Sequence, residues 1–368
     1  MSKTRMLLTV LSVSAYILFY SSSVSAQIRT VLVSPVPGDP IASGTSLRNA
    51  LAGISSPSST NRWLLKIEPG IYDLQSISLE MRPWVDIEGS GINLTTIRSS
   101  QTTILGASNT ELRMLTVEAI GNQTGGLGPN VIAMFNENAN PRVYRVKFVT
   151  QTTNSEAWGM RNFSSAPKIE ECEFSVSGGI HLVHGITFVG FISTGARSSI
   201  IRSRIAVSGT GTSYGVFMVG GQTVTEIQDT RIDAIGGSAS YGIYALPGGW
   251  QGSESLALRN VVINSAGASS LSAGIYLEGG TTVGLEIYNS KVWGHVAPTT
   301  YGIFQGGNIS SGIRLSSVVG FTKTVQTAGN ISIGLTDLIG GPVTASGWLG
   351  CQGVVDEMGV FYPNSCPQ

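Results

Sequence analysis

The hydrophobic and polar positions of this chain repeat with a step of 26 to 32 residues between Trp158 and Phe304. Each repeat contains a glycine, then an apolar residue and then, in most copies, an aromatic one. Apolar and polar residues alternate around each copy with the period of a β-strand, and no helical period accompanies them. Such self-similarity is typical of a solenoid built from short strands. The glycines of the series are Gly159, Gly185, Gly215, Gly242, Gly274 and Gly302.

A second series of apolar residues keeps pace with the glycines. From each member to the next glycine the distance is 15 or 16 residues, whereas from a glycine to the next member it varies from 10 to 16. Variable loops are therefore expected at one corner of each coil, which should contain three short strands. Two polar residues after three of the members break the alternation. They predict a tight corner where Asp229, Asn260 and Asn289 stack, because Asn and Asp tolerate a left-handed backbone. The members from which these distances are counted are Val143, Ile169, Ile200, Ile227, Leu258, Ile287 and Ile313.

The first 26 residues have the features of a secretory signal peptide. Lys3 and Arg5 form a positive start, residues 6–20 are apolar, and small residues precede a cleavage site after Ala26. The apolar stretch is shorter than the roughly 20 residues that a membrane-spanning helix needs, and no other run approaches that length. We therefore expect export, a mature chain from Gln27 without a transmembrane segment, and a secreted, extracellular or periplasmic location.

Composition narrows the class of protein further. Glycine makes up 47 of the 368 residues, and charged residues make up 12%, about half the usual share. The 22 basic and 22 acidic residues cancel, so the sequence indicates no electrostatic partner. These features exclude a coiled coil, a basic nucleic-acid binder and a charge-rich disordered protein. The apolar residues, 42% of the chain, supply ample material for a core.

Three cysteines in an exported protein allow one disulfide and one free thiol. Cys351 and Cys366 lie 15 residues apart in a tail rich in Gly and Pro, and pairing them would contribute roughly 3 kcal/mol through loop-closure entropy. Cys172 falls in a row of small, inward-facing residues of the repeat, together with Ser203 and Thr230. It is therefore expected to be a buried thiol and not a nucleophile.

Three motifs precede the repeat: a helix-like segment at 44–51, the sequence Ile-Glu-Pro-Gly-Ile-Tyr at 67–72 and Val-Asp-Ile-Glu-Gly-Ser-Gly at 85–91. With the repeat, they resemble the pectin lyase-like superfamily of right-handed parallel β-helices, which includes pectate lyases, polygalacturonases and pectin methylesterases. The resemblance implies an all-β, right-handed parallel β-helix with a short N-terminal capping helix, and variable loops beside the sheet that carries a substrate groove. No specific enzyme family is matched.

The resemblance also suggests how the chain is divided. The signal peptide occupies 1–26, and the N-terminal cap with the first strands occupies 27–84. The coils of the parallel β-helix are expected over 85–330. The C-terminal tail with its disulfide is expected over 331–368.

Aromatic residues recur on the outward side of the glycine-containing strand. The residue after each glycine is uniformly apolar, so by alternation it points inward and the next residue points outward. Four outward aromatic residues on successive coils would form a flat strip that suits the faces of sugar rings. An exposed strip of this kind predicts polysaccharide binding. Alternatively, the tail or the loop with Trp250 covers the strip, or the rings only stack as a ladder. The four residues are Phe217, Tyr244, Tyr276 and Phe304.

Candidates for catalysis are few. The outward positions offer Arg161 and Glu278, with Gln305 nearby. General acid/base hydrolysis needs two facing carboxylates, and a divalent-cation site usually needs more than one acid. No catalytic motif of the superfamily can therefore be transferred, and no cofactor is expected. A site assembled from the variable loops stays open, because catalytic groups often lie on loops over a rigid scaffold.

The charged residues gather elsewhere in the repeat. A corner row and an outward row place acids between bases of adjacent coils, which predicts a ladder of surface salt bridges, each worth under about 1 kcal/mol. The corner row is Arg145, Glu171, Arg202 and Asp229, and the outward row is Lys147, Glu173, Arg204 and Arg231.

His181 and His184 form an H-x-x-H pair, which on a helix would suggest a metal site. This segment has the pattern of a strand and corner, where three-residue spacing points the side chains to opposite faces, so no metal site is predicted. His184 precedes a glycine, as do Trp158 and Tyr214 in their coils, and is expected to be a stacked ring.

Three functional hypotheses follow from the sequence. The first is an extracellular protein that binds polysaccharide through the aromatic row without catalysis of the superfamily type. The second is a polysaccharide lyase, glycoside hydrolase or esterase with a loop-built site. The third is a surface structural or adhesive solenoid whose aromatic strip is a protein interface. The glycan and the oligomeric state stay open.

Overall fold

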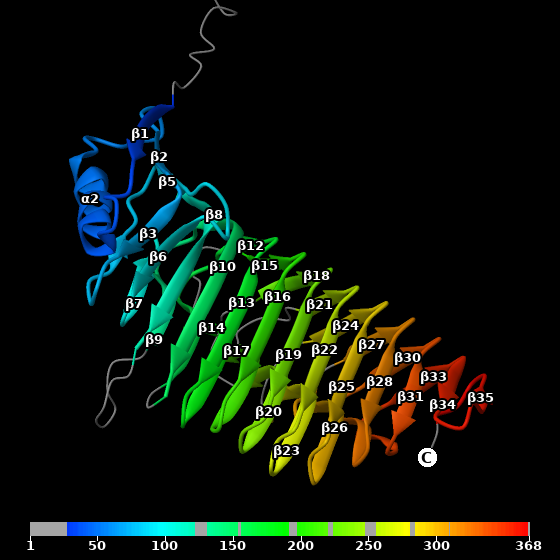
Figure 1. The fold of residues 1–368 in the computed structure, drawn as a ribbon. Coiled ribbons are helices and arrows are strands. Elements are labelled where there is room, and N and C mark those ends of the chain that lie inside the picture. The colour runs from blue at the N-terminus through cyan, green and yellow to red at the C-terminus, as the bar shows by residue number, and fades with distance from the viewer. Residues whose placement is uncertain are drawn as a thin grey trace, which may run out of the picture.

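The structure is a computed structural model that describes residues 28–121, 131–153, 156–190, 197–219, 224–246, 255–279, 284–308 and 310–366. The predicted signal peptide and the loop with Trp250 lie outside the described residues. The described chain is a stack of parallel coils that runs from a short helix at one end to the C-terminal tail at the other (Figure 1). The parallel β-helix that the sequence predicted is thus confirmed.

One of the sheets has eleven strands in the described residues, and it holds the glycine series. We call it the aromatic sheet. Each strand pairs in parallel with the equivalent strand of the next coil, so that residues of the repeat lie in rows along the stack. The strands are β4 (Leu79–Glu80), β7 (Thr102–Leu105), β9 (Val131–Glu137), β11 (Ala157–Phe163), β14 (Leu182–Val189), β17 (Thr212–Val219), β20 (Ala239–Leu246), β23 (Leu271–Leu277), β26 (Thr299–Gln305), β29 (Lys323–Thr327) and β32 (Val343–Ala345).

The remaining strands form a second, folded sheet with two faces, and the first face begins each coil. Its strands are β1 (Arg29–Val33), β2 (Trp63–Ile67), β5 (Val85–Glu88), β8 (Glu111–Ile120), β10 (Arg142–Thr152), β12 (Lys168–Glu170), β15 (Ser198–Ile201), β18 (Val224–Gln228), β21 (Ser255–Arg259), β24 (Gly284–Tyr288), β27 (Ser311–Arg314), β30 (Ile331–Gly334) and β33 (Leu349–Gln352).

The second face follows after a sharp corner, across which β8 and β10 run without a break. Its other strands are β3 (Gly70–Asp73), β6 (Thr95–Ser99), β13 (Glu173–Gly178), β16 (Arg204–Ser208), β19 (Arg231–Ile235), β22 (Val262–Ala266), β25 (Lys291–His295), β28 (Ser317–Gly320), β31 (Asp337–Gly340) and β34 (Val354–Asp356), which pairs in antiparallel fashion with β35 (Phe361–Tyr362).

The sharp corner is the two-residue corner that the sequence predicted, and we call it the tight corner. Asp229, Asn260 and Asn289 have φ angles of +49°, +54° and +47° there, in the left-handed region. Asn260 Nδ2 donates to Asp229 Oδ1 at 2.8 Å, and Asn289 Nδ2 donates to Asn260 Oδ1 at 2.7 Å. The predicted stacking is confirmed. The corner row in chain order is Met114, Arg145, Glu171, Arg202, Asp229, Asn260, Asn289, Leu315 and Leu335, each with positive φ.

The glycine series is a packing requirement of the aromatic sheet. A Cβ atom on Gly215 would lie 2.5 Å from the carbonyl oxygen of Gly242 in the next coil and 2.3 Å from Ile232 Cγ2 in the core. The same conflict recurs at the other glycines of the series, so no larger residue fits between the coils. The apolar residues that follow these glycines are fully buried, as the alternation predicted.

Both ends of the coil stack are closed by chain segments. Helix α2 (Pro40–Gly53) starts after Asp39, whose carboxylate accepts a hydrogen bond from the Ala42 amide at 2.9 Å. Leu47 and Leu51 of the helix are buried against the first coils, which confirms the predicted capping helix. Among the described residues, no helix has the length and apolar character needed to cross a membrane.

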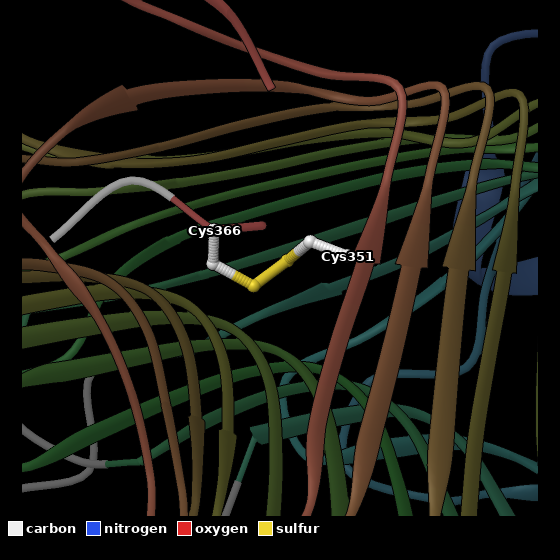
Figure 2. The surroundings of a disulfide bond; sticks show 2 residues. All are labelled: Cys351 and Cys366. Carbon is white, nitrogen blue, oxygen red and sulfur yellow. A yellow bond between two sulfur atoms is a disulfide. The ribbon is translucent and has the colours of Figure 1, made fainter. Parts of the chain in front are cut away.

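At the C-terminal end, strands β30 to β34 continue the coils beyond residue 330, inside the segment predicted as a tail. Cys351 of β33 is bonded to Cys366, which confirms the predicted disulfide (Figure 2). Cys351 belongs to the buried core and Cys366 packs against it. The bond therefore ties the end of the chain to the last coil.

Cys172 is the buried free thiol that the sequence predicted. It lies directly after the tight corner, in a row of small side chains, and its amide donates to Ser203 Oγ at 3.1 Å. The Ser203 amide in turn donates to Thr230 Oγ1 at 3.2 Å. Burial raises the pKa of the Cys172 thiol to about 12, so the thiol stays protonated and unreactive.

Candidate functional site

The outward side of the aromatic sheet carries two adjacent rows of rings, which together we call the aromatic face. The second row follows the buried apolar residues. Its ring centroids lie 5.7 Å apart between Phe217 and Tyr244, 5.4 Å between Tyr244 and Tyr276, and 4.4 Å between Tyr276 and Phe304. The first row precedes the glycines and contains Trp158, His184, Tyr214, Tyr241 and Tyr301. The two rows touch edge to face, for example at Tyr214 and Phe217.

The rings of the second row stack face to face, with interplanar angles of 6° to 15°. Their faces are thus occupied by one another. Phe217, Tyr276 and Phe304 are half-buried, and Tyr244 is 8% exposed. The geometry differs from the flat strip expected from the sequence, because coils about 4.8 Å apart leave room for stacked rings and not for rings that lie flat.

Glu278 lies on the aromatic face, where Tyr244 donates a hydrogen bond from its hydroxyl to Glu278 Oε1 at 3.0 Å. Burial, and then the Glu278 carboxylate, raise the pKa of the Tyr244 hydroxyl above its ordinary value. Burial raises the pKa of Tyr214 to about 12, and Glu278 contributes to that shift as well. The tyrosines therefore keep their protons and can act as hydrogen-bond donors beside a carboxylate acceptor.

Arg161 lies at the other end of the aromatic face. Its guanidinium carbon is 4.9 Å from the centroid of the Trp158 ring and 5.8 Å from that of Phe135, so that the cation packs on two rings. From Arg161 the row runs through Thr187, Phe217 and Tyr244 to Tyr276, which lies two residues before Glu278 in the same coil. Four coil steps correspond to about 19 Å. The structure does not bring the two candidate residues together.

Carboxylates do not pair on this face within the described residues. The acids in the described strands of the aromatic sheet are Glu80 and Glu137, on β4 and β9 near the N-terminal end. Gln305, the third residue considered, is buried and accepts a hydrogen bond from Ser311 Oγ at 2.8 Å. The described strands of the aromatic sheet therefore do not supply the two facing carboxylates that general acid/base hydrolysis needs.

His184 is the stacked ring that the sequence predicted. Its centroid lies 4.0 Å from that of Trp158 and 4.9 Å from that of Tyr214, and Nδ1 is 3.2 Å from Thr187 Oγ1. Burial, helped by the nearby Arg161 cation, lowers the pKa of His184 to about 3. The ring is therefore neutral under ordinary conditions. His181, in contrast, is exposed to solvent.

The predicted salt-bridge ladder is confirmed in part, at Arg145, Glu171 and Arg202 of the tight corner. Among the described residues, Lys147 and Glu173 form no ion pair, and Asp229 is hydrogen-bonded to Gln228 and Asn260. Arg204 and Arg231 contact Asp233 instead, at 4.0 Å and 2.7 Å.

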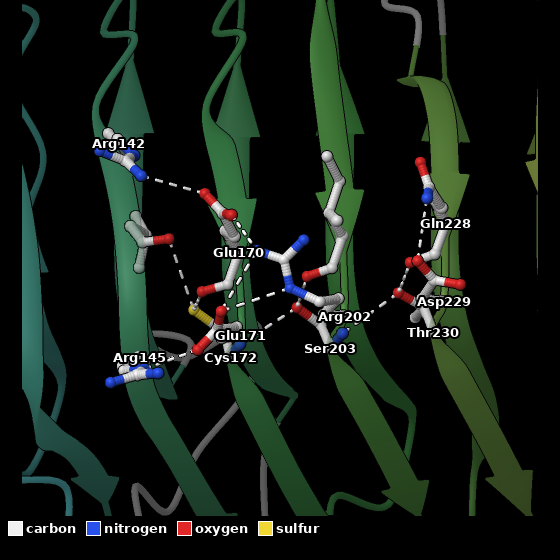
Figure 3. Close-up of polar contacts among 12 residues, drawn as sticks. Arg142, Arg145, Glu170, Glu171, Cys172, Arg202, Ser203, Gln228, Asp229 and Thr230 are labelled. Carbon is white, nitrogen blue, oxygen red and sulfur yellow. Dashed lines mark hydrogen bonds and ion pairs between the residues drawn. The ribbon is translucent and has the colours of Figure 1, made fainter.

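Arg145 and Arg202 contact the Glu171 carboxylate at 2.6 Å and 3.2 Å, and Arg142 contacts Glu170 at 3.1 Å (Figure 3). Arg145 first, and Arg202 with it, lower the pKa of Glu171 below its ordinary value. Each charge of this group is paired with a charge of a neighbouring coil, so the ladder has the features of a structural element.

Near the C-terminus the structure shows a cleft that the sequence analysis missed. It has a volume of 1280 Å³ and lies on the outward side of the last coils, beside Trp348, Leu335 and Phe361. A signal was present in the sequence, because Leu315 and Leu335 occupy corner positions that hold Asp or Asn in the preceding coils. The repeat itself records only the features that the coils share.

Comparison with known proteins supports the fold and leaves the activity open. No protein family and no curated protein matches the sequence. The structure is similar to that of the Dettilon tailspike protein, with a TM-score of 0.56 at 10% identity over 90% of this chain and 63% of that chain. This chain thus spans less than two thirds of the tailspike protein.

Lower similarity is found to two catalytic proteins. The catalytic domain of a GH87 alpha-1,3-glucanase gives a TM-score of 0.45 at 12% identity, over 88% of this chain and 67% of that chain. The pectate lyase Pel9A gives 0.41 at 10% identity, over 88% and 78%. The parallel β-helix itself is the fold that the resemblance of the sequence to the pectin lyase-like superfamily implied.

Proposed function

We propose that this protein is exported and binds an extracellular polysaccharide along the aromatic face, without catalysis of the superfamily type. The observation that carries the proposal is the contiguity of two aromatic rows on one outward face, with tyrosine hydroxyls and the Glu278 carboxylate among the rings. Partly exposed rings that lie together on one outward face, with hydroxyl donors among them, favour an interaction site. A solenoid presents such a surface as an elongated strip, which suits an elongated ligand.

The stacked geometry defines how a glycan would be held. Sugar hydroxyls would accept hydrogen bonds from the tyrosine hydroxyls and donate to Glu278, and the apolar faces of sugar rings would pack on ring edges. The last ring of the row is an exception, because Phe304 is followed in the next coil by Gln326 and not by another ring. On its C-terminal side Phe304 thus neighbours an amide side chain, which can exchange hydrogen bonds with sugar hydroxyls.

The proposal is tested by passing the mature chain from Gln27 over an array of polysaccharides that includes pectins and alginates. Retention is recorded, together with the release of reducing or unsaturated ends in the same wells. Retention without product supports the proposal. Product formation would contradict it in favour of an enzyme with a loop-built site.

Two substitutions test the assignment of the surface. Tyr276→Ala and Tyr244→Ala are expected to weaken retention several-fold while the circular dichroism spectrum of a β-solenoid is retained, because each removes a ring and a hydroxyl donor. Tyr276→Phe keeps the stack and removes only the hydroxyl, so that it separates the two contributions. Unchanged retention in both alanine variants would overturn the aromatic face as the site. Self-association that is lost on charging this face would point instead to an adhesive solenoid.

A further inference from the structure

The C-terminal cleft lies on a different side of the molecule from the aromatic face. Its floor is the outward side of β30 and β33, where Ser332, Gly334 and Gly350 present little or no side chain. One wall is formed by Trp348, and the other by residues of the tail, beginning with Phe361. The indole of Trp348 packs over Gly350, where a Cβ would lie 2.2 Å from its Cη2 atom, whereas a Cβ on Gly334 would have only ordinary contacts of 3.8 Å or more.

Large apolar side chains in this cleft are open to solvent. Leu335 is 64% exposed, Trp348 63% and Phe361 60%. Leu315 and Leu335 also adopt left-handed φ angles of +50° and +49°. This conformation is more costly for Leu than for the Asn and Asp that hold the same corner position in earlier coils. The chain thus tolerates both exposure and strain at this place, a combination that concentrates at functional sites.

Arg314 is the cation of the cleft. In the row to which it belongs, the arginines of earlier coils have acidic partners: Arg113 contacts Glu88 at 2.6 Å, and Arg259 contacts Glu226 at 3.9 Å. Among the described residues, Arg314 takes part in no ion pair, and the residues that line the cleft include no acid. Its charge is thus available to an anion.

We propose that this cleft binds a small amphiphilic carboxylate, with its apolar body between Trp348 and Leu335 and its carboxylate on Arg314. Arginine suits a carboxylate because its planar guanidinium donates two parallel hydrogen bonds. Gly334 leaves space on the floor beside Arg314, and the aromatic and leucine side chains supply the apolar contact. This site is independent of the proposed glycan site on the aromatic face.

The disulfide holds the wall of the cleft in place. The tail residues Phe361 to Ser365 lie between β34 and Cys366, which is bonded to Cys351 beneath the floor. Gly353 has a φ of +64°, and a Cβ atom added to it would lie 2.9 Å from Leu335 Cδ2 and 3.7 Å from Phe361 Cε2. The cleft therefore depends on a glycine at this turn and on the tether of the chain end.

Isothermal titration with 3-phenylpropanoate tests the proposal, with 3-phenylpropanamide as the neutral probe of the same shape. We expect the carboxylate to bind at least about tenfold more tightly than the amide, the factor expected for a hydrogen bond to a charged group. Arg314→Gln is expected to reduce carboxylate binding by about tenfold. Arg259→Gln, which removes an exposed arginine of the same row outside the cleft, is expected to leave it unchanged. Trp348→Ala should weaken both probes.

Several results would overturn the proposal. One is the absence of binding of 3-phenylpropanoate to the folded wild-type chain up to about 10 mM. Others are equal affinities for the acid and the amide, or the same affinity in Arg314→Gln and Arg259→Gln. A wild-type dimer that Leu335→Asn dissociates, and that 3-phenylpropanoate leaves intact, would assign the cleft to self-association. Tyr276→Ala separates the two sites, since it should leave carboxylate binding unchanged whatever its effect on glycans.

Discussion

The aromatic face and the tight corner are both built from rows to which each coil contributes one residue. The two regions differ in how the side chains of a row interact. In the corner, hydrogen bonds and ion pairs connect each polar side chain to its neighbour, as in the contacts of Asn260 with Asp229 and Asn289. On the aromatic face the neighbours stack, but tyrosine hydroxyls and the Glu278 carboxylate retain capacity for further hydrogen bonds.

The difference also extends to the backbone. The corner needs left-handed residues. Asn, Asp and charged side chains fill most of these positions, and Met114, Leu315 and Leu335 fill the others. The aromatic sheet needs glycine, because the coils approach too closely for a Cβ. The coils of a solenoid thus share their backbone geometry, while the chemistry of their side chains differs. We interpret a row whose polar side chains all bond to one another as structural. We interpret a row whose polar groups can form further hydrogen bonds as a candidate binding surface.

The largest effect is expected beneath the aromatic face. Gly242→Ala would place a Cβ 2.1 Å from Ile263 Cγ2 and 2.6 Å from the Gly274 carbonyl oxygen. Relief of this overlap requires movement of two coils, and we expect a loss of about 3 kcal/mol in the free energy of unfolding. Gly279→Ala is the control, because its nearest contact would be an ordinary 3.8 Å from Gly306. Equal stability of the two variants in denaturant titrations would contradict the account.

The pH dependence of stability distinguishes the two regions. His184 has a folded-state pKa of about 3, below its ordinary value of 6.5, so the unfolded chain binds the extra proton between these values. Acidification from pH 7 to 5 should therefore remove about 2 kcal/mol of stability. His184→Phe should abolish this loss of stability between pH 7 and 5. His181→Gln, at an exposed position, should keep the loss. A wild-type loss that persists in His184→Phe would show that another group is responsible.

In the tight corner, Asn260 separates the backbone requirement from the side-chain contacts. Asn260→Ala removes both the residue type suited to a left-handed backbone and the side-chain hydrogen bonds. We expect a loss of about 1 kcal/mol in the free energy of unfolding, because alanine is disfavoured at a φ of +54°. Asn260→Gly restores the backbone preference and lacks the two ladder hydrogen bonds, so it should be the more stable variant of the two. The reverse order in thermal unfolding would mean that the hydrogen bonds dominate.

The smallest effect is expected for the charge ladder. The lowered pKa of Glu171 means that its pairing with Arg145 stabilises the fold fully above pH 4.5 and is lost as the pH falls through the lowered folded-state value. Glu171→Gln should thus reduce the melting temperature slightly at pH 7, and the difference should vanish in strong acid or high salt. Glu173→Gln, which removes a carboxylate without an ion pair among the described residues, is the matched control.

Much of the fold could be predicted because the repeat records constraints that every coil shares. The spacing located the tight corner, the inward rows and the side with variable loops, and it identified His184 and Cys172 as structural members of their rows. Strict alternation could not predict that Tyr214 and Phe217 both lie on the outward side, since their separation of three residues requires the backbone to deviate at Gly215.

The site was harder to predict, because it depends on side-chain torsions and on departures from the repeat. Whether Tyr276 lies flat or stacks is decided by its rotamer and by the spacing of the coils, which the sequence does not record. Arg161 and Glu278 share an outward face, but the distance between them depends on the number of coils that separate them. The C-terminal cleft arises where Leu335 and Trp348 break the pattern, so a search for shared features passes over it.

The most direct test of the account compares matched tyrosine variants on the two faces with a polysaccharide that the wild-type chain retains. Tyr276→Ala removes a ring of the aromatic face, and Tyr144→Ala removes a ring that packs beside Arg142 and Arg145 near the tight corner. The account predicts that retention falls several-fold in the first variant and is unchanged in the second. Equal retention by both variants, or a loss confined to Tyr144→Ala, would contradict the assignment of glycan binding to the aromatic face.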